Sequence, residues 1–215
     1  MLRRLRETTD FRIVVVDDGS MPKCDTVFRE AAQYAKVLRH RRNRGKGAAI
    51  KTGLRWLERG GCPADATILL MDADGQHRVA DGIRLAACSR SHPNALCLGS
   101  RVFHGHIPLR SRFGNMVTRW VFFAVTGIGV QDTQTGLRAF SAGHIPLMNA
   151  ITGNRYEYEM NMLLTCADRK IPFCEMPIKT VYIDHNASSF FRPVTDSARI
   201  YRTILSFALS KGDKQ

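Results

Sequence analysis

The sequence predicts an α/β protein with a mostly parallel, doubly wound sheet in a single domain. First, β-branched runs alternate with helical segments, and this alternation requires the crossover connections that parallel strands use. Second, several of these runs end in polar turns, where ligands of such sheets bind. Third, the chain has 215 residues, of which 44% are hydrophobic and 24% charged. These proportions suit one globular domain and exclude disordered, collagen-like and coiled-coil chains.

The first half of the chain follows the alternation closely. Residues 11–16 form a β-branched run, and the turn signal Asp17-Asp18-Gly19-Ser20 ends it. The elements expected after it are a helix at 23–35, a short strand at 37–38, a helix from 43–47 to about 59, a strand at 67–71, a helix at 79–89 and a strand at 95–98.

The second half is less regular. The elements expected there are a helix with an aromatic, apolar face at 111–126, a loop at 132–138, a short strand at 139–140, a helix at 156–168, a strand at 178–183 and a terminal helix at 198–209. We expect a single domain over residues 1–215, with residues 198–215 as a terminal amphipathic helix and tail.

The charge of the chain is strongly basic and informs us about its partners. Thirty-two Lys and Arg against 19 Asp and Glu give a formal net charge of +13. Nucleic acid, an anionic membrane surface or phosphorylated small molecules would suit this excess. The densest basic patch covers residues 39–44, and it could face anionic lipid headgroups or only solvent.

Targeting and cysteine patterns favour a cytoplasmic protein. No apolar run reaches the roughly 18 residues of a spanning helix. Residues 2–11 are charged throughout and lack the apolar core of a signal peptide. The six cysteines show no C-x-x-C pair and no histidine at zinc-finger spacing, so we interpret them as reduced thiols.

The sharpest candidate for chemistry is Asp72-Ala73-Asp74, directly after the strand expected at 67–71. Side chains at positions i and i+2 of an extended segment point to one side, so both carboxylates can converge on one cation. Carboxylate oxygens suit Mg²⁺ or Mn²⁺. Gln76 and His77 are close enough to add a ligand or support one. The alternative is a solvated turn.

Two further segments could contact a nucleotide. Asp17 and Asp18 could accept hydrogen bonds from a base or a ribose, or they could only form a turn. Residues 43–47, which include Lys46, open a helix whose free N–H groups favour an anion. Gly47 stands where a phosphate loop requires Ser or Thr, and Ile50 stands at the third glycine of G-x-G-x-x-G. An ATPase or NAD enzyme is therefore disfavoured.

Several residues in or near loops could bind a diphosphate or an acceptor. Arginine side chains match diphosphate oxygens, although they could also be ordinary surface residues. The candidate arginines are Arg101, Arg110, Arg112 and Arg192. Asp132, in the loop 132–138, could orient an acceptor or stabilise the loop. Glu157 and Glu159 open a helix, where their charge suits the helix dipole without any further function.

Seven segments, taken together and in order, resemble the family 2 inverting glycosyltransferases, most closely the branch of polyprenyl- or dolichyl-phosphate glucosyl- and mannosyltransferases. They extend from residue 13 to residue 201. The segments are IVVVDDGS, NRGKGAAIKTG, ILLMDADGQH, LGSR, DTQTGLRAF, YEYEMNMLL and IKTVYIDHNASSFFRPVTDSARIY.

The resemblance implies a GT-A fold, which is a Rossmann-like, mostly parallel sheet flanked by helices. It implies transfer of a hexose, with inversion, from a UDP-glucose or GDP-mannose type of donor to a polyprenyl phosphate, with Mg²⁺ or Mn²⁺ as cofactor. On the donor side, the resemblance implies nucleoside contact for Asp17 and Asp18, donor contact for Lys46, and binding of the metal and diphosphate by Asp72, Asp74 and Gln76. It implies that Arg101, with Arg110 or Arg112, also binds the diphosphate. It places Asp132 and Arg138 on the acceptor side and implies that Arg192 closes over the site.

The chain departs from the resemblance in two places. The family usually begins with a strand that ends in a P-x-x-N-E-like segment, and residues 1–10 supply neither. We therefore expect a sheet that lacks a central strand, with unpaired edges and an open nucleotide pocket, as in a shortened gene product. In addition, Phe190 stands where this branch commonly has a histidine.

Two alternatives remain open. The chain could be a catalytically impaired relative that only binds a nucleotide sugar. The charge alone would allow a nucleic-acid-binding protein, but no signature of a nucleic-acid-binding fold supports it, so we expect no nucleic acid. We expect a cytoplasmic enzyme, with peripheral contact to the anionic cytoplasmic face of a membrane.

Overall fold

The computed structural model describes residues 1–101, 109–179 and 193–212; within them, the side chains of residues 109–114, 193–198, 206 and 210–212 are not described. The α/β alternation predicted from the sequence is confirmed. In order, the elements of the first half are α1 (Leu2–Thr8), β1 (Val14–Asp17), the 3₁₀ turn η1 (Pro22–Cys24), α2 (Asp25–Ala31), β2 (Lys36–Arg39), α3 (Lys46–Arg59), β3 (Thr67–Leu70), α4 (Val79–Ser91) and β4 (Leu96–Arg101). Those of the second half are α5 (Leu109–Thr126), β5 (Arg138–Ser141), the 3₁₀ turn η2 (Ala142–His144), α6 (Ile145–Ala150), α7 (Glu157–Asp168), β6 (Phe173–Ile178) and α8 (Pro193–Gly212).

The described strands form two sheets instead of the single sheet that the sequence predicts. Strands β1 and β2 pair in parallel, and the second sheet has the order β3-β5-β4-β6. Strands β4 and β6 are parallel, whereas β5 runs antiparallel to both of its neighbours. Helix α5, which precedes β5, packs against α7 and α8. It therefore does not act as the crossover helix that would make β5 parallel.

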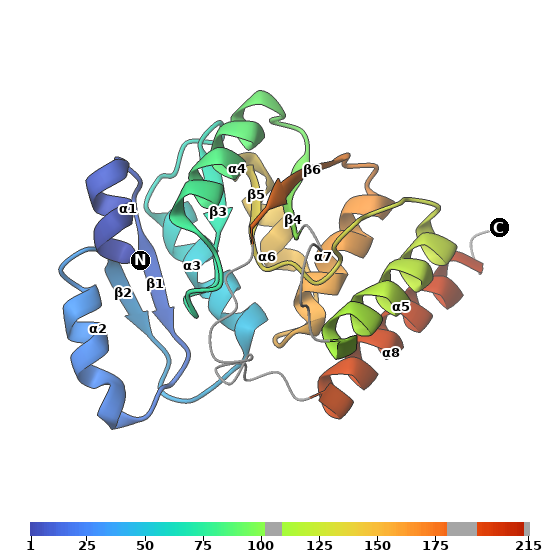
Figure 1. The fold of residues 1–215 in the computed structure, drawn as a ribbon, viewed down its shortest axis with the longest axis horizontal. Coiled ribbons are helices and arrows are strands. Elements are labelled where there is room, and N and C mark those ends of the chain that lie inside the picture. Colours follow the sequence, from blue (N-terminus) through green and yellow to red (C-terminus); the bar gives the residue numbers. More distant parts are fainter. Residues whose placement is uncertain (102–108, 180–192, 213–215) are drawn as a thin grey trace.

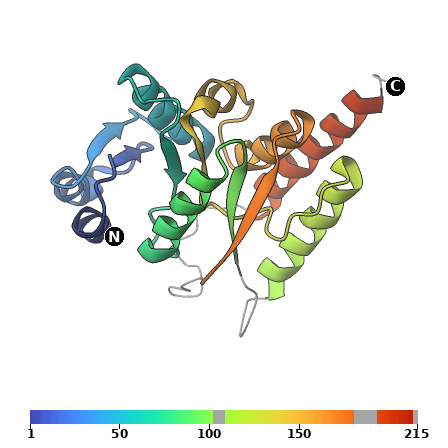
Figure 2. The ribbon, with the colours of Figure 1, turned by 90° about the horizontal axis from the view of Figure 1, so that it is seen from above.

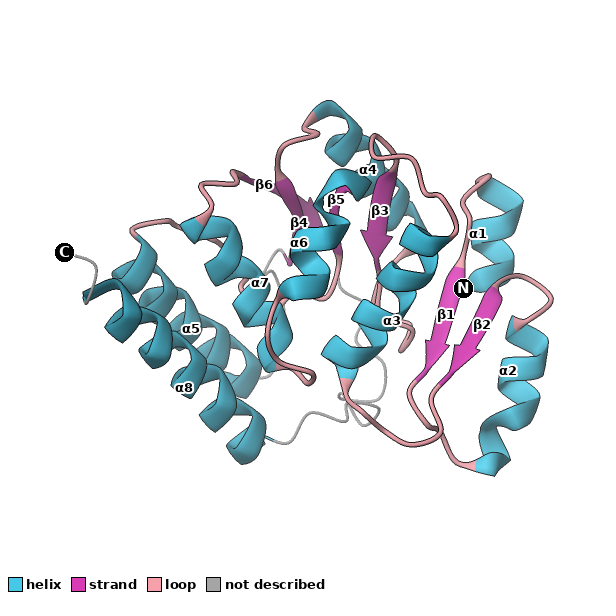
Figure 3. Cartoon of the chain, turned by 180° about the vertical axis from the view of Figure 1, so that it is seen from behind, coloured by secondary structure: helices cyan, strands magenta, loops and turns pink. Residues whose placement is uncertain are grey.

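The two sheets leave one edge of β1 and one edge of β3 without a strand neighbour among the described residues. The strand that the sequence led us to expect as missing stays a prediction. The first residues of the chain form helix α1, which the sequence did not predict. In Figures 1 and 3, β1 and β2 lie at one end of the molecule with α1 and α2, and α3 lies beside β1.

Helices cover both faces of the four-stranded sheet (Figure 2). Helix α4 packs on one face, while α6 and α7 lie on the other. Leu96 and Leu98 of β4 belong to the larger core cluster with α6 and α7, and Cys97 between them belongs to the cluster on the α4 side. This alternation is what a strand buried on both faces requires.

Strand β6 begins earlier than the sequence predicts. It covers Phe173–Ile178 and meets the strand expected at 178–183 only at Ile178, while residues 180–183 lie outside the described residues. Pro177 makes this segment a poor strand by sequence, since proline lacks the N–H of the ladder. Because β6 is an edge strand of the described sheet, that N–H is not needed on its outer side.

Helices α5 and α8 lie side by side at the end opposite β1 (Figures 1 and 2). Each exposes large apolar side chains: Met116, Trp120 and Phe123 on α5, and Leu205 and Leu209 on α8. Trp120, in the helix that the sequence predicted to have an aromatic, apolar face, is 69% exposed. Of the helices that the structure describes, none combines the length and the apolar character needed to cross a membrane.

Candidate active site

The centre of the candidate site is a lysine held between two carboxylates. Lys46 Nζ lies 2.8 Å from Asp72 Oδ1 and 2.9 Å from Glu159 Oε1. Lys46 begins α3, Asp72 follows β3, and Glu159 lies in the first turn of α7. Three segments far apart in the sequence thus meet at the carboxyl end of β3, where the fold class places a ligand.

The charges of this cluster stabilise one another. Burial disfavours the Lys46 ammonium, but the charges of Glu159 and Asp72 outweigh it and raise the pKa of Lys46 above its usual range. Burial likewise disfavours the Asp72 carboxylate, and Lys46 outweighs it, with help from His77, so the pKa of Asp72 is held well below its usual range. Lys46 and Asp72 are therefore both charged at neutral pH.

The turn after β1 supports the start of α3. Asp18 accepts hydrogen bonds from the backbone N–H groups of Arg44, at 2.9 Å, and Gly45, at 2.7 Å. Gly45 caps α3 with a φ of 100°, a conformation that favours glycine. Asp18 therefore holds the backbone that carries Lys46, and His40 Nδ1 lies 2.7 Å from its Oδ1.

Asp17 is buried and paired within the protein. Its Oδ1 accepts the N–H of Ser20 at 2.8 Å, and its Oδ2 lies 2.9 Å from Arg39 Nε in an ion pair. Its side chain has no exposed surface. In this structure Asp17 stabilises the turn after β1, Asp18 holds the start of α3, and their implied contact with a nucleoside stays a prediction.

The loop 132–138 lies directly against Asp72. A Cβ atom added to Gly136 would be 2.1 Å from Asp72 Oδ2. The fully buried Arg138 fixes this loop to α7, since it donates hydrogen bonds to the carbonyl oxygens of Thr135, at 2.9 Å, and Glu159, at 2.7 Å. Arg138 thus lies behind the loop, although the resemblance implied that it lines the acceptor side.

Arg101 and Asp132, which the resemblance assigned to different ligands, are paired with each other. Arg101 Nε and Nη2 donate to the two carboxylate oxygens of Asp132 at 2.6 and 2.9 Å. The Asp132 side chain is fully buried, while that of Arg101 is 19% exposed. Asp132 therefore orients the guanidinium of Arg101.

A divalent cation would find suitable donors beside Lys46. Asp72, Asp74 and Glu159 offer carboxylate oxygens. The Lys46 ammonium already lies between the carboxylates of Asp72 and Glu159. Asp74 is exposed and accepts the N–H of Gln76 at 3.0 Å, while His77 Nε2 lies 3.6 Å from Asp72 Oδ2. Among the described side chains, these groups do not form a preassembled three-ligand cluster, so an ion would draw Asp74 towards Asp72.

Other predicted residues are placed only in part. Arg110 and Arg112 lie in the first turns of α5, where side chains are not described, and Arg192 lies outside the described residues. Sequence reasoning treated Glu159 as a helix-dipole residue and missed its contact with Lys46. No local signal distinguishes these two roles, because the contact depends on how α7 packs against α3.

The chain belongs to glycosyl transferase family 2, because the sequence profile of "Glycosyl transferase family 2" matches residues 1–143. An uncharacterised protein of Methanocaldococcus jannaschii is 29% identical over 95% of this chain and 84% of its own length.

Relatives with named activities act on dolichyl phosphate. The UDP-N-acetylglucosamine–dolichyl-phosphate N-acetylglucosaminyltransferase of Methanococcus voltae is 28% identical, over 81% of this chain and 76% of its own length. The human dolichyl-phosphate β-glucosyltransferase is also 28% identical, over 81% of this chain and 57% of its own length.

The fold is also seen in a solved structure, that of glucosyl-3-phosphoglycerate synthase from Mycobacterium tuberculosis with Mn²⁺, UDP and glucosyl-3-phosphoglycerate. It has a TM-score of 0.73 at 18% identity, over 96% of this chain and 73% of the other.

Proposed function

We propose that this glycosyltransferase moves a hexose from a nucleotide-diphosphate sugar to a polyprenyl phosphate, with inversion and with Mg²⁺ or Mn²⁺. The names of two relatives specify a dolichyl-phosphate acceptor, and one of them specifies a UDP-sugar. A protein of the same fold was crystallised with Mn²⁺ and UDP. These names favour UDP-glucose over GDP-mannose among the donors that the sequence left open.

The observation that carries the proposal is the Lys46 cluster beneath the loop 132–138. Asp72 and Asp74 would hold the cation, with Gln76 or His77 in support, and the bound cation would neutralise charge on the departing diphosphate. Lys46 keeps its proton because Asp72 and Glu159 raise its pKa. Its fixed positive charge can therefore stabilise the leaving group in the transition state.

The acceptor side needs no general base in this proposal. A phosphate oxygen is already anionic near neutral pH and can attack the anomeric carbon directly. Both oxygens of Asp132 bind Arg101, so Asp132 would orient this guanidinium towards a phosphate and would not accept a proton. Attack from the face opposite the leaving diphosphate inverts the anomeric centre.

Helices α5 and α8 support a lipid acceptor. Met116, Trp120 and Phe123 recur at the spacing of one helix face, as do Leu205 and Leu209. Exposed apolar helix faces on a chain with a net charge of +13 fit peripheral contact with an anionic bilayer. Such contact would bring the enzyme to its membrane-bound acceptor.

Calorimetric titration with UDP-glucose and GDP-mannose, with Mn²⁺ and with EDTA, tests the donor site. Transfer to a short-chain polyprenyl phosphate in detergent then tests the reaction. We expect Mn²⁺-dependent donor binding and transfer in the wild type and in Asp65→Ala, which removes an exposed carboxylate elsewhere. Asp74→Ala should lose both while it stays folded.

Three results would contradict parts of the proposal. Full activity of Asp74→Ala would refute its metal role. Donor binding without transfer to any polyprenyl phosphate would identify the impaired relative. Steeply salt-dependent binding to DNA or RNA, without donor binding, would indicate a nucleic-acid-binding protein.

A further inference from the structure

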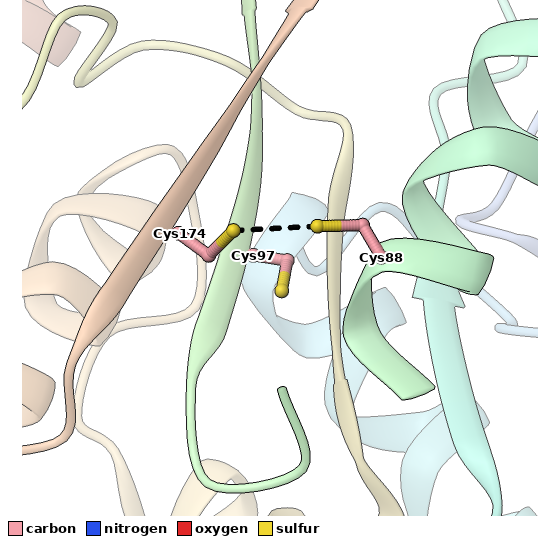
Figure 4. Close-up of side chains that lie close together, drawn as sticks. All are labelled: Cys88, Cys97 and Cys174. Atoms are coloured by element: carbon pink, nitrogen blue, oxygen red, sulfur yellow. Dashed lines mark hydrogen bonds between the residues drawn. The ribbon is translucent and has the colours of Figure 1, made fainter. Parts of the chain in front are cut away.

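Three cysteines from three elements meet beneath α4, away from the Lys46 cluster. Cys88 lies in α4, Cys97 in β4 and Cys174 in β6, and their three sulfur atoms lie within 4.8 Å of one another (Figure 4). The sulfurs of Cys88 and Cys174 are 3.3 Å apart. The sequence showed no ligand spacing because the cluster is made by the fold.

The sheet register explains how the cluster forms. Cys97 pairs directly with Cys174 in the parallel β4–β6 ladder, so both side chains point to the same face of the sheet. Helix α4 covers that face and adds Cys88 from above (Figure 4). The three sulfurs are therefore positioned by rigid elements, which favours a defined geometry.

The spacing suits thiolate ligands of one metal ion. Zinc–sulfur bonds are about 2.3 Å long, so sulfurs of a tetrahedral site lie about 3.8 Å apart. The observed separations, 3.3 Å for one pair and no more than 4.8 Å for the others, bracket this value. A disulfide would use two of the three sulfurs and leave the buried Cys97 without a role.

Apolar residues surround the buried side of the cluster. Leu85 and Ala139 belong to the same buried core cluster as Cys97, whereas Cys88 and Cys174 are half-buried. A bound metal ion would supply the positive charge that displaces the protons of the three thiols.

A histidine and a surface pocket lie beside the cysteines. His92 Nδ1 is 3.9 Å from Cys88 Sγ and donates a hydrogen bond to the carbonyl oxygen of Cys88 at 2.9 Å. His92 and Cys174 both line a pocket of about 220 Å³. This pocket opens beside one of the three cysteines.

We propose that Cys88, Cys97 and Cys174 bind one Zn²⁺ ion through their thiolates. Three metal–sulfur bonds form, the three thiol protons pass to solvent, and no electron is transferred. The ion would join α4 to β4 and β6. This site is independent of the proposed glycosyl transfer.

Metal titration of the reduced, chelator-treated full-length protein tests the site. Cd²⁺ should produce thiolate-to-metal charge-transfer absorption that saturates at one ion per chain, and Zn²⁺ should displace it and raise Tm. Cys88→Ser and Cys174→Ser should weaken Zn²⁺ binding at least about 100-fold. Cys24→Ser and Cys62→Ser, which change half-buried cysteines elsewhere, should bind as the wild type does.

A second measurement needs no variant. Zn²⁺ should protect Cys88 and Cys174 of the wild-type protein from alkylation, as mapped by mass spectrometry, and leave Cys24 and Cys62 reactive. Absence of Zn²⁺ and Cd²⁺ binding by the folded, reduced protein would overturn the proposal. Binding that survives both Cys88→Ser and Cys174→Ser would also overturn it. A Cys88–Cys174 disulfide in a protein that binds no metal would assign the pair to redox chemistry instead.

Discussion

Gly136→Ala should uncouple the loop 132–138 from Asp72. The new Cβ would lie 2.1 Å from Asp72 Oδ2 and 2.7 Å from its Cγ, whereas such contacts essentially never fall below 3.0 Å. The carboxylate must therefore move by about 0.9 Å, the difference between these two distances, or the loop must withdraw. Either shift disturbs the contacts of Lys46 Nζ with Oδ1, at 2.8 Å, and Oδ2, at 3.1 Å.

The size of the effect follows from that displacement. Forcing one methyl group into a packed site costs about 1–3 kcal/mol of folding stability. A misplacement of about 1 Å in a catalytic group lowers activity about 100-fold. We therefore expect Gly136→Ala to fold with a lower Tm and to lose about two orders of magnitude in kcat/KM for Mn²⁺-dependent transfer from the donor.

Gly129→Ala is the matched control. No atom lies within 4 Å of its added Cβ, and neither glycine has a positive φ, so both backbones accept alanine. Thermal denaturation and initial-rate kinetics on both variants separate the steric effect from a general glycine effect. Wild-type kcat/KM in a folded Gly136→Ala protein would refute the position of Asp72 in the donor site.

Three further predictions concern stability. Arg138→Met removes the buried hydrogen bonds that tie the loop 132–138 to α7, so urea titration should show a free energy of unfolding lower by about 2–4 kcal/mol; an unchanged midpoint would contradict this. Tyr158→Phe removes one buried hydrogen bond and should lower the free energy of unfolding by only about 1 kcal/mol. A loss as large as that of Arg138→Met would contradict this. Lys46 depresses the pKa of Asp72. The ion pair therefore stabilises the fold at pH values above about 4, the usual aspartate pKa, and this stabilisation is lost progressively as the pH falls below that value. The Tm difference between wild type and Asp72→Asn should therefore shrink on acidification, and a constant difference would argue against the pairing.

Local signals predicted most of the elements and two of the three residues of the Lys46 cluster. The β-branched runs before Asp17 and Asp72 and the polar turns that end them depend on neighbouring residues only, so their strands were predicted correctly. Lys46 was expected at a helix start for the same reason. Glu159 was not assigned to the site, because its contact with Lys46 depends on packing between α7 and α3.

The sequence does not show whether a polar side chain contacts a ligand or the protein backbone. Asp18 accepts backbone N–H groups at the start of α3, and Arg138, which the resemblance assigned to the acceptor side, is fully buried. Residue type and spacing are the same whether such a side chain contacts a substrate or supports the backbone that does. The short strand expected at 139–140 is present as β5, but its antiparallel direction was not predicted, because the position of α5 is set by its distant partners α7 and α8.

The pairing of the four-stranded sheet has a consequence for how the chain folds. Thr67 pairs with Ser141 and Leu96 with Phe173, so each ladder must close a long loop before it gains its hydrogen bonds. The β1–β2 pair, in which Val14 meets Lys36, needs a much shorter closure. Sheets with such distant contacts form slowly. The Lys46 site joins α3 to β3 and α7, so it is assembled only at the late step that brings residues from both halves of the chain together.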